Sequence, residues 1–247
     1  MHRLSRPGRL SSVSLTDALL DRSSARPLIT FYDDATGERI ELSGVTTANW
    51  AAKTANLLRD ECDVEPGTTV AVLLPAHWQT AAVLLGAWWC GAQIVGEPVG
   101  ADLVLCDRER LDLALSAAPP LGVVALSLHA FGAGIDGLPA GVVDYATEVR
   151  LHGDDFVPWE PVPDSAPALD GLPVERVRDS ARSRAAALGL SGSDRVLSTL
   201  DWSSPGGLSD GLLAVLAAGA SLVQVRNADD AALTRRAESE RTTIRLG

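Results

Sequence analysis

The chain has 247 residues, 46% of them hydrophobic, so it can bury a sizeable core and is not a disordered protein. Its formal net charge of −11 excludes the partners that are bound through clustered Lys and Arg, which are nucleic acids and anionic membranes. Cys62, Cys90 and Cys106 are odd in number and widely spaced, so we expect neither a disulfide framework nor a metal site. We therefore expect a cytoplasmic protein.

No signal peptide or membrane span is predicted. The basic start at residues 3–9 is followed by residues 13–20, whose apolar pattern Asp17 interrupts. Residues 80–96 carry no charge, but their glycines and Gln93 fit a buried helix followed by a strand better than a bilayer span.

The first part of the chain alternates between helices and strands. A helix is predicted over residues 14–21, with Ser14 or Thr16 as its cap, and a hairpin follows around the turn at residues 34–37. The next predicted elements are a helix at 50–58, a strand at 70–75, a helix at 77–89, strands at 93–95 and 103–106, a helix at 108–115 and a strand at 123–126.

Five prolines fall within residues 153–173, which we interpret as an extended connection between two subdomains. The predicted boundaries are 1–150 for the first subdomain, 151–173 for the connection and 174–247 for the second. The second contains predicted helices at 174–188, 208–218 and 229–240 and predicted strands at 195–199, 221–225 and 242–245. Such alternation predicts an α/β fold with a parallel sheet that helices cover on both faces.

Two stretches carry a resemblance to a known family. The first, at residues 42–98, places the segment VEPG between a helix and the strand VAVLLP, and then continues into an apolar helix that ends in CGA. The second, at residues 188–247, contains DRVLS and the run LAVLAAGASLV. In this order they resemble the amino-terminal part of the adenylate-forming enzymes, which include acyl-CoA synthetases, nonribosomal adenylation domains, luciferases and short actinobacterial members. The resemblance implies an α/β fold with two parallel or mixed sheets flanked by helices.

The resemblance fails where that family binds phosphate. The family has a run of Ser, Thr and Gly there that ends in Gly-x-Pro-Lys-Gly, because backbone N–H groups, hydroxyls and a lysine together hold the anion. In this sequence, residues 164–169 resemble the segment before that loop and residues 171–173 resemble the segment after it, and only Asp170 separates the two. Val174 stands at the position of the family's lysine. The sequence therefore predicts that the phosphate-binding loop is missing.

The resemblance also implies that the adenine-binding motif, the ribose-binding Asp and the lid with its catalytic lysine would lie beyond residue 247. Lys53 is the single lysine of the sequence and matches no family motif. We therefore expect a truncated, non-catalytic relative, or pseudoenzyme, with no catalytic residue and no cofactor.

The candidate residues of a residual cleft are Gly206, Gly207 and Trp202. The two glycines precede a predicted helix, whose first N–H groups could accept an anion, although a tight turn explains them as well. Trp202, with Ser203, falls where the resemblance places residues near the acyl pocket, although packing against the core explains it as well.

Three functional hypotheses stay open at this point. The first is a non-catalytic binding or regulatory protein, and the second is a binder of a nucleotide or an acyl group in the cleft. The third is an enzyme of changed chemistry, for which Asp201, His152 and Asp154 are the weak candidates, while His77 and His129 have no acidic neighbour in the sequence. We also expect a symmetric homodimer, because truncation would leave an apolar face or a strand edge uncovered.

Overall fold

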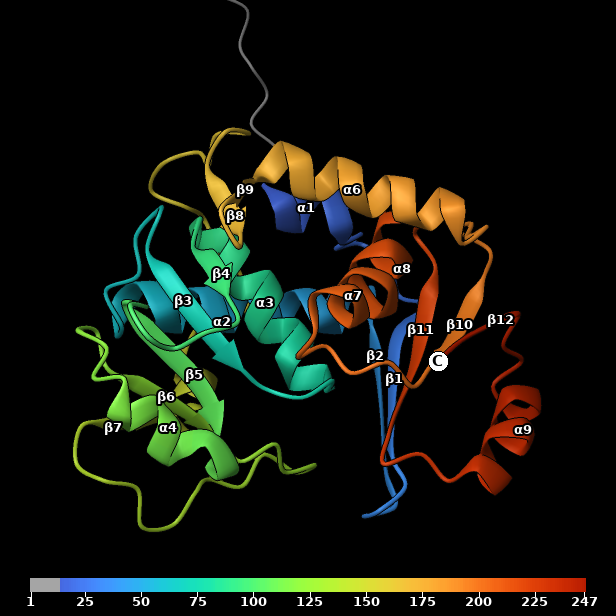
Figure 1. Cartoon of the computed structure of the whole chain (residues 1–247), viewed down its shortest axis with the longest axis horizontal. Helices are drawn as coiled ribbons and strands as arrows, with labels where there is room; N and C mark the ends of the chain where they lie inside the picture. The colour runs from blue at the N-terminus through green and yellow to red at the C-terminus, as the bar shows by residue number, and fades with distance from the viewer. Residues whose placement is uncertain (1–13) are drawn as a thin grey trace, which may run out of the picture.

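The computed structural model describes residues 14–247, so the basic residues at 3–9 and His2 lie outside the described part. Figure 1 shows two sheets separated by helices α2 and α3, with α4 outside one sheet and α9 outside the other. This α/β arrangement, with two mixed sheets flanked by helices, confirms the predicted fold class.

One sheet is built from strands of the first and the last parts of the described chain. Its strand order is β12-β10-β11-β1-β2, and β1 pairs in parallel with β11 but antiparallel with β2. Its strands are β1 (Pro27–Asp33), β2 (Glu38–Ser43), β10 (Arg195–Ser198), β11 (Ser221–Arg226) and β12 (Ile244–Leu246). The predicted hairpin is present, and it is completed by strands that come from the second half of the chain.

The other sheet has the order β7-β6-β5-β3-β4-β8-β9 and is parallel except for its last pair, β8 and β9. Its strands are β3 (Thr69–Leu73), β4 (Gln93–Val95), β5 (Leu103–Asp107), β6 (Val123–Leu126), β7 (Val142–Asp144), β8 (Pro167–Leu169) and β9 (Leu172–Pro173). The short β7 was not predicted, and β8 and β9 lie inside the segment that was predicted to be a plain connection.

The helices mostly begin where a side chain can accept a backbone N–H. Helix α2 starts six residues before the predicted position because Ser43 Oγ accepts the N–H of Thr46 at 3.1 Å. The helices are α1 (Leu15–Leu19), α2 (Gly44–Asp60), α3 (Trp78–Cys90), α4 (Leu111–Ser116), α5 (Tyr145–Glu148), α6 (Val174–Ala187), α7 (Pro205–Leu208), α8 (Ala214–Ala217) and α9 (Asp230–Ser239). A π-helical turn, Ser209–Leu213, joins α7 to α8, and α5 was not predicted.

The central layer is formed by α2 against α3, and every residue of α3 is buried. The two helices approach closely at Gly86, where a Cβ would lie 2.7 Å from the Cβ of Thr54. The indole N–H of Trp88 donates to the carbonyl oxygen of Ala168 at 2.9 Å, which ties α3 to β8. Over residues 14–247, no helix has the length and apolar character needed to cross a bilayer.

The division into two subdomains at residues 151–173 stays a prediction. The sheets are not divided at this segment, because one of them contains strands from both sides of it. Strands β1 and β2 precede this segment and share a sheet with β10, β11 and β12, which follow it. One continuous hydrophobic core also extends through both sheets and the helices between them. The two halves of the chain are therefore packed as one body around α2 and α3.

Candidate functional site

A tight hairpin occupies the place where the family resemblance predicts a phosphate-binding loop. Strands β8 and β9 pair through Leu169 and Leu172, and only Asp170 and Gly171 lie between them. Both have positive φ, 46° and 80°, which is the backbone of a two-residue type I′ turn. The N–H of Asp170 donates to the carbonyl oxygen of Ile94 in β4 at 2.9 Å. The turn therefore presents a carboxylate, and one of its N–H groups is already used in the sheet.

Beside this hairpin lies a cavity of about 870 Å³. It extends along β3 and β4, from Thr69 and Gln93 to the loop that follows β4. Its walls are mainly apolar side chains of β3 and β4, together with the loop 96–101, the turn 169–171 and the loop 202–205. Its size and its mainly apolar walls suit a small organic molecule.

Trp202 lines this cavity and is only 5% exposed. Its Nε1–H has no hydrogen-bond partner among residues 14–247. The ring lies against the π-helical turn at Gly211, where a Cβ would be 3.0 Å from Nε1. A buried N–H without a partner costs free energy that a hydrogen bond would recover.

Gly206 and Gly207 do not line the cavity. The N–H of Gly207 donates to Ser204 Oγ at 3.1 Å, so the helix cap already uses it. A Cβ at Gly207 would lie 1.8 Å from the carbonyl oxygen of Asp201, which means that only glycine fits there. Gly206 faces open space. An anion site at these two glycines thus stays a prediction, while the structure gives Gly207 a packing role.

The three weak catalytic candidates are not brought together around the cavity. Asp201 accepts the Oγ–H of Ser203 at 2.8 Å and so shapes its own loop. Lys53 Nζ donates to the carbonyl oxygen of His152 at 2.6 Å and forms an ion pair with Asp154 at 2.8 Å. The single lysine of the chain therefore fastens the loop at 152–155 to α2, and none of these three residues lines the cavity.

The cysteines pack as apolar side chains. Burial raises the pKa of Cys62, Cys90 and Cys106 to about 12, so the thiols stay protonated at neutral pH. No group of three or more His, Cys, Asp or Glu within residues 14–247 is arranged to hold a metal ion.

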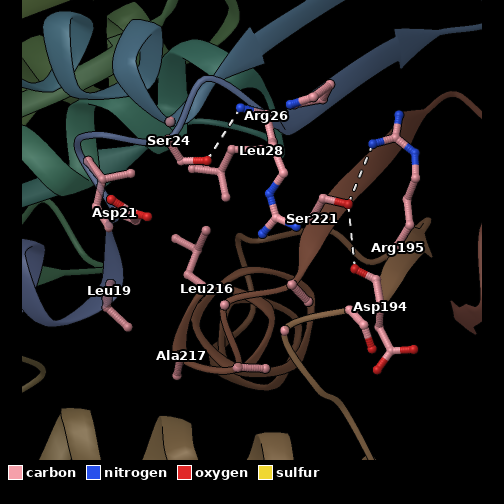
Figure 2. Close-up of a pocket in the computed structure, with 18 of the residues that line it drawn as sticks. Leu19, Asp21, Ser24, Arg26, Leu28, Asp194, Arg195, Leu216, Ala217 and Ser221 are labelled. Carbon is pink, nitrogen blue, oxygen red and sulfur yellow. Dashed lines mark hydrogen bonds between the residues drawn. The ribbon is translucent and has the colours of Figure 1, made fainter.

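A second cavity, of about 640 Å³, lies at the opposite ends of the strands, where β1, β10 and β11 begin. Figure 2 shows that the Ser221 hydroxyl is hydrogen-bonded to Arg195 and to the backbone of Asp194. The Arg195 guanidinium also binds Glu240. These groups are satisfied by the protein itself, and the sequence contained no motif that marked this cavity.

Comparison with known proteins finds a similar sequence and several solved structures of similar fold. No family model matches the chain. The "TIGR03089 family protein" of Mycobacterium tuberculosis is 54% identical over 236 residues, which are 94% of this chain and 96% of that protein.

Among solved structures, the Brucella canis acyl-CoA synthetase matches with a TM-score of 0.77 at 20% identity, over 96% of this chain and 47% of that one. The anthranilate CoA ligase AuaEII, in complex with anthranoyl-AMP, matches with a TM-score of 0.73 at 18% identity, over 95% of this chain and 49% of that one. The benzoate CoA ligase of Burkholderia xenovorans LB400 matches with a TM-score of 0.72 at 16% identity, over 95% and 50%. The chain thus spans about half the length of these ligases and has the fold of their amino-terminal region.

Proposed function

The chain belongs to the TIGR03089 family, and from this premise we propose that it is a non-catalytic relative of the adenylate-forming ligases that acts as a binding protein. The ligand that we propose is a small carboxylic acid or acyl group, held in the cavity beside Trp202. Nucleotide binding is the less favoured alternative, because the cavity offers no cradle for polyphosphate.

The observation that carries this proposal is the turn at Asp170 and Gly171. In the ligase fold this is the edge at which a glycine-rich loop is expected to surround ATP phosphates, yet here a two-residue turn closes the strand pair. The Asp170 carboxylate would repel a polyphosphate, and no lysine is near it because Lys53 is bound to Asp154. The cavity beside Trp202, by contrast, is open, and the N–H of Trp202 has no hydrogen-bond partner among residues 14–247.

The test has two parts. Benzoate and hexanoate are titrated into the purified protein by calorimetry, with Trp202→Phe as the variant that keeps an aromatic ring but lacks the N–H. We expect binding that this variant weakens about five- to tenfold, the value of one hydrogen bond. Pyrophosphate release from ATP in the presence of either acid is measured in parallel, and release above the protein-free rate would contradict the non-catalytic assignment.

We also propose that the protein forms a symmetric homodimer. The segment 151–159 exposes three large apolar side chains, Leu151, Val157 and Trp159, and Trp159 is 74% exposed. The edge strands β2, β12, β7 and β9 offer further unpaired backbone groups. Light scattering after gel filtration is expected to give twice the chain mass at micromolar concentration, and a Trp159→Ser variant is expected to shift that mass toward the monomer.

A further inference from the structure

A third cavity, of about 650 Å³, lies beyond the carboxyl ends of β1 and β11 of one sheet and of β5 and β6 of the other. It shares no lining residue with the cavity beside Trp202. Its wall includes His77, Glu38 and Arg226, and none of these residues has a part in the function proposed above.

The protonation state of His77 follows from its position. It is the N-cap of α3, where its Nδ1 accepts the N–H of Gln79 at 3.1 Å, and its ring contacts the ring of Phe31 edge-on at 4.4 Å. A nitrogen that accepts a hydrogen bond carries no proton, so the proton of the neutral imidazole is on Nε2. Burial lowers the pKa of His77, and the opposing effect of Glu38 is smaller, which agrees with a neutral ring.

That Nε2–H faces the Glu38 carboxylate without reaching it. Nε2 lies 3.8 Å from Glu38 Oε1, which is too long for a hydrogen bond, and neither atom has another partner among the residues 14–247. His77 is 1% exposed and the Glu38 side chain 9%. An oxygen placed to one side could lie about 2.8 Å from both atoms, accepting from His77 and donating to Glu38. A hydroxyl group meets both requirements.

Arg226, at the end of β11, is one of the three arginines that line the cavity. Its guanidinium makes no hydrogen bond or ion pair within the described part of the chain, and it is half-buried. The other two already have partners. Arg39 is bound to Glu41 and Glu240 at 2.9 and 3.1 Å, and Arg108 donates to the carbonyl oxygen of Asp136 at 2.9 Å.

The acidic groups of the wall are largely satisfied as well. Asp33 accepts the side-chain N–H of Asn227 and the backbone N–H of Ala35, and Asp107 is bound by Arg110. Glu38 is the remaining buried carboxylate, so an anionic group would be repelled at its end of the cavity and attracted at the Arg226 end.

We propose that this cavity binds a small hydroxylated anion, whose hydroxyl lies between His77 Nε2 and Glu38 Oε1 and whose carboxylate or phosphate binds Arg226. The buried pair fixes the position of the hydroxyl, and the unpaired guanidinium selects the anion.

The test compares anions that carry hydroxyl groups with anions that carry none. D-Glycerate and glycerol 3-phosphate are titrated by calorimetry at millimolar concentration, together with propionate and methyl phosphate, which lack the hydroxyls. We expect the hydroxylated members to bind at least tenfold more tightly than their counterparts, and we expect the His77 Nε2 resonance to shift on binding.

Two arginine variants test the charge. Arg226→Gln is expected to weaken binding at least tenfold, while Arg235→Gln on the exposed face of α9 is expected to leave it unchanged. The proposal is overturned if neither hydroxylated ligand binds, if the non-hydroxylated ligands bind equally well, or if the two arginine variants behave alike. A water molecule bridging His77 and Glu38 alone would give the first of these results.

Discussion

The cavity beside Trp202 and the cavity beside His77 differ in their chemistry. The cavity beside Trp202 has mainly apolar walls, and the N–H of Trp202 has no hydrogen-bond partner among residues 14–247. The cavity beside His77 has buried polar groups and an unpaired arginine. The comparison shows that the buried polar pair of His77 and Glu38 lies in one cavity, while the cavity beside Trp202 is bounded mainly by apolar side chains.

The largest effect is expected at the loop that shapes the Trp202 cavity. Gly207→Ala places a Cβ 1.8 Å from the backbone oxygen of Asp201, so the loop must move. We expect the free energy of unfolding to fall by about 3 kcal/mol, the upper part of the range for overpacking. Gly206→Ala is the control, because it meets open space and should be neutral or slightly stabilising. Equal denaturation midpoints for the two variants would contradict this packing.

The next effect concerns Glu240, which neutralises Arg39 at the wall of the His77 cavity. Burial acts to raise its pKa, but hydrogen bonds from Tyr32, Arg195 and Arg39 outweigh burial and lower the pKa from 4.5 to about 2. A depressed carboxyl pKa stabilises the fold above pH 4.5, and this contribution is lost as the pH falls toward 2. We expect wild type to lose about 2 kcal/mol more than Glu240→Gln over this interval, measured by urea unfolding. Parallel pH profiles would show that the network contributes nothing.

A smaller effect is expected from His77. Its folded pKa lies below the unfolded value of 6.5, so the unfolded chain binds the proton more readily. Stability is therefore complete above pH 6.5 and falls with decreasing pH below it, by at most about 1.4 kcal/mol per pH unit. His77→Asn keeps an N-cap acceptor and should remove this dependence between pH 6.5 and 5. An unchanged slope in the variant would assign the dependence to other groups.

The smallest effect is expected in the two-residue turn at Asp170 and Gly171, between β8 and β9. Gly171→Ala forces a side chain into a backbone with φ of 80° and should cost about 1 kcal/mol. Asp170→Asn, which suits the same turn, should be neutral or slightly stabilising. A thermal-unfolding comparison in which Gly171→Ala is the more stable variant would mean that the turn is not closed as described.

Features that depend on neighbouring residues could be predicted from the sequence, whereas features that depend on residues far apart in the chain could not. The very short connection at Asp170 and the order of strands and helices were predicted from the sequence, because turn residues and hydrophobic periodicity are local signals. The pairing of β1 with β11 was not predicted, because nothing local states which distant strand completes a sheet. His77 was read as lacking an acidic neighbour, and the fold supplies Glu38 from a distant hairpin. The polar cavity therefore could not be found before the fold was known.

The central claim, that the ligase cleft no longer holds ATP phosphates, is tested most directly by thermal unfolding with and without millimolar ATP–magnesium and AMP. A ligand present at about 100 times its dissociation constant adds about 2.7 kcal/mol, which is several degrees for a chain of this size. We predict no shift with ATP–magnesium, because the Asp170 turn offers neither a cradle nor a cation. A rise of several degrees with ATP–magnesium would contradict the account and restore nucleotide chemistry to this cleft.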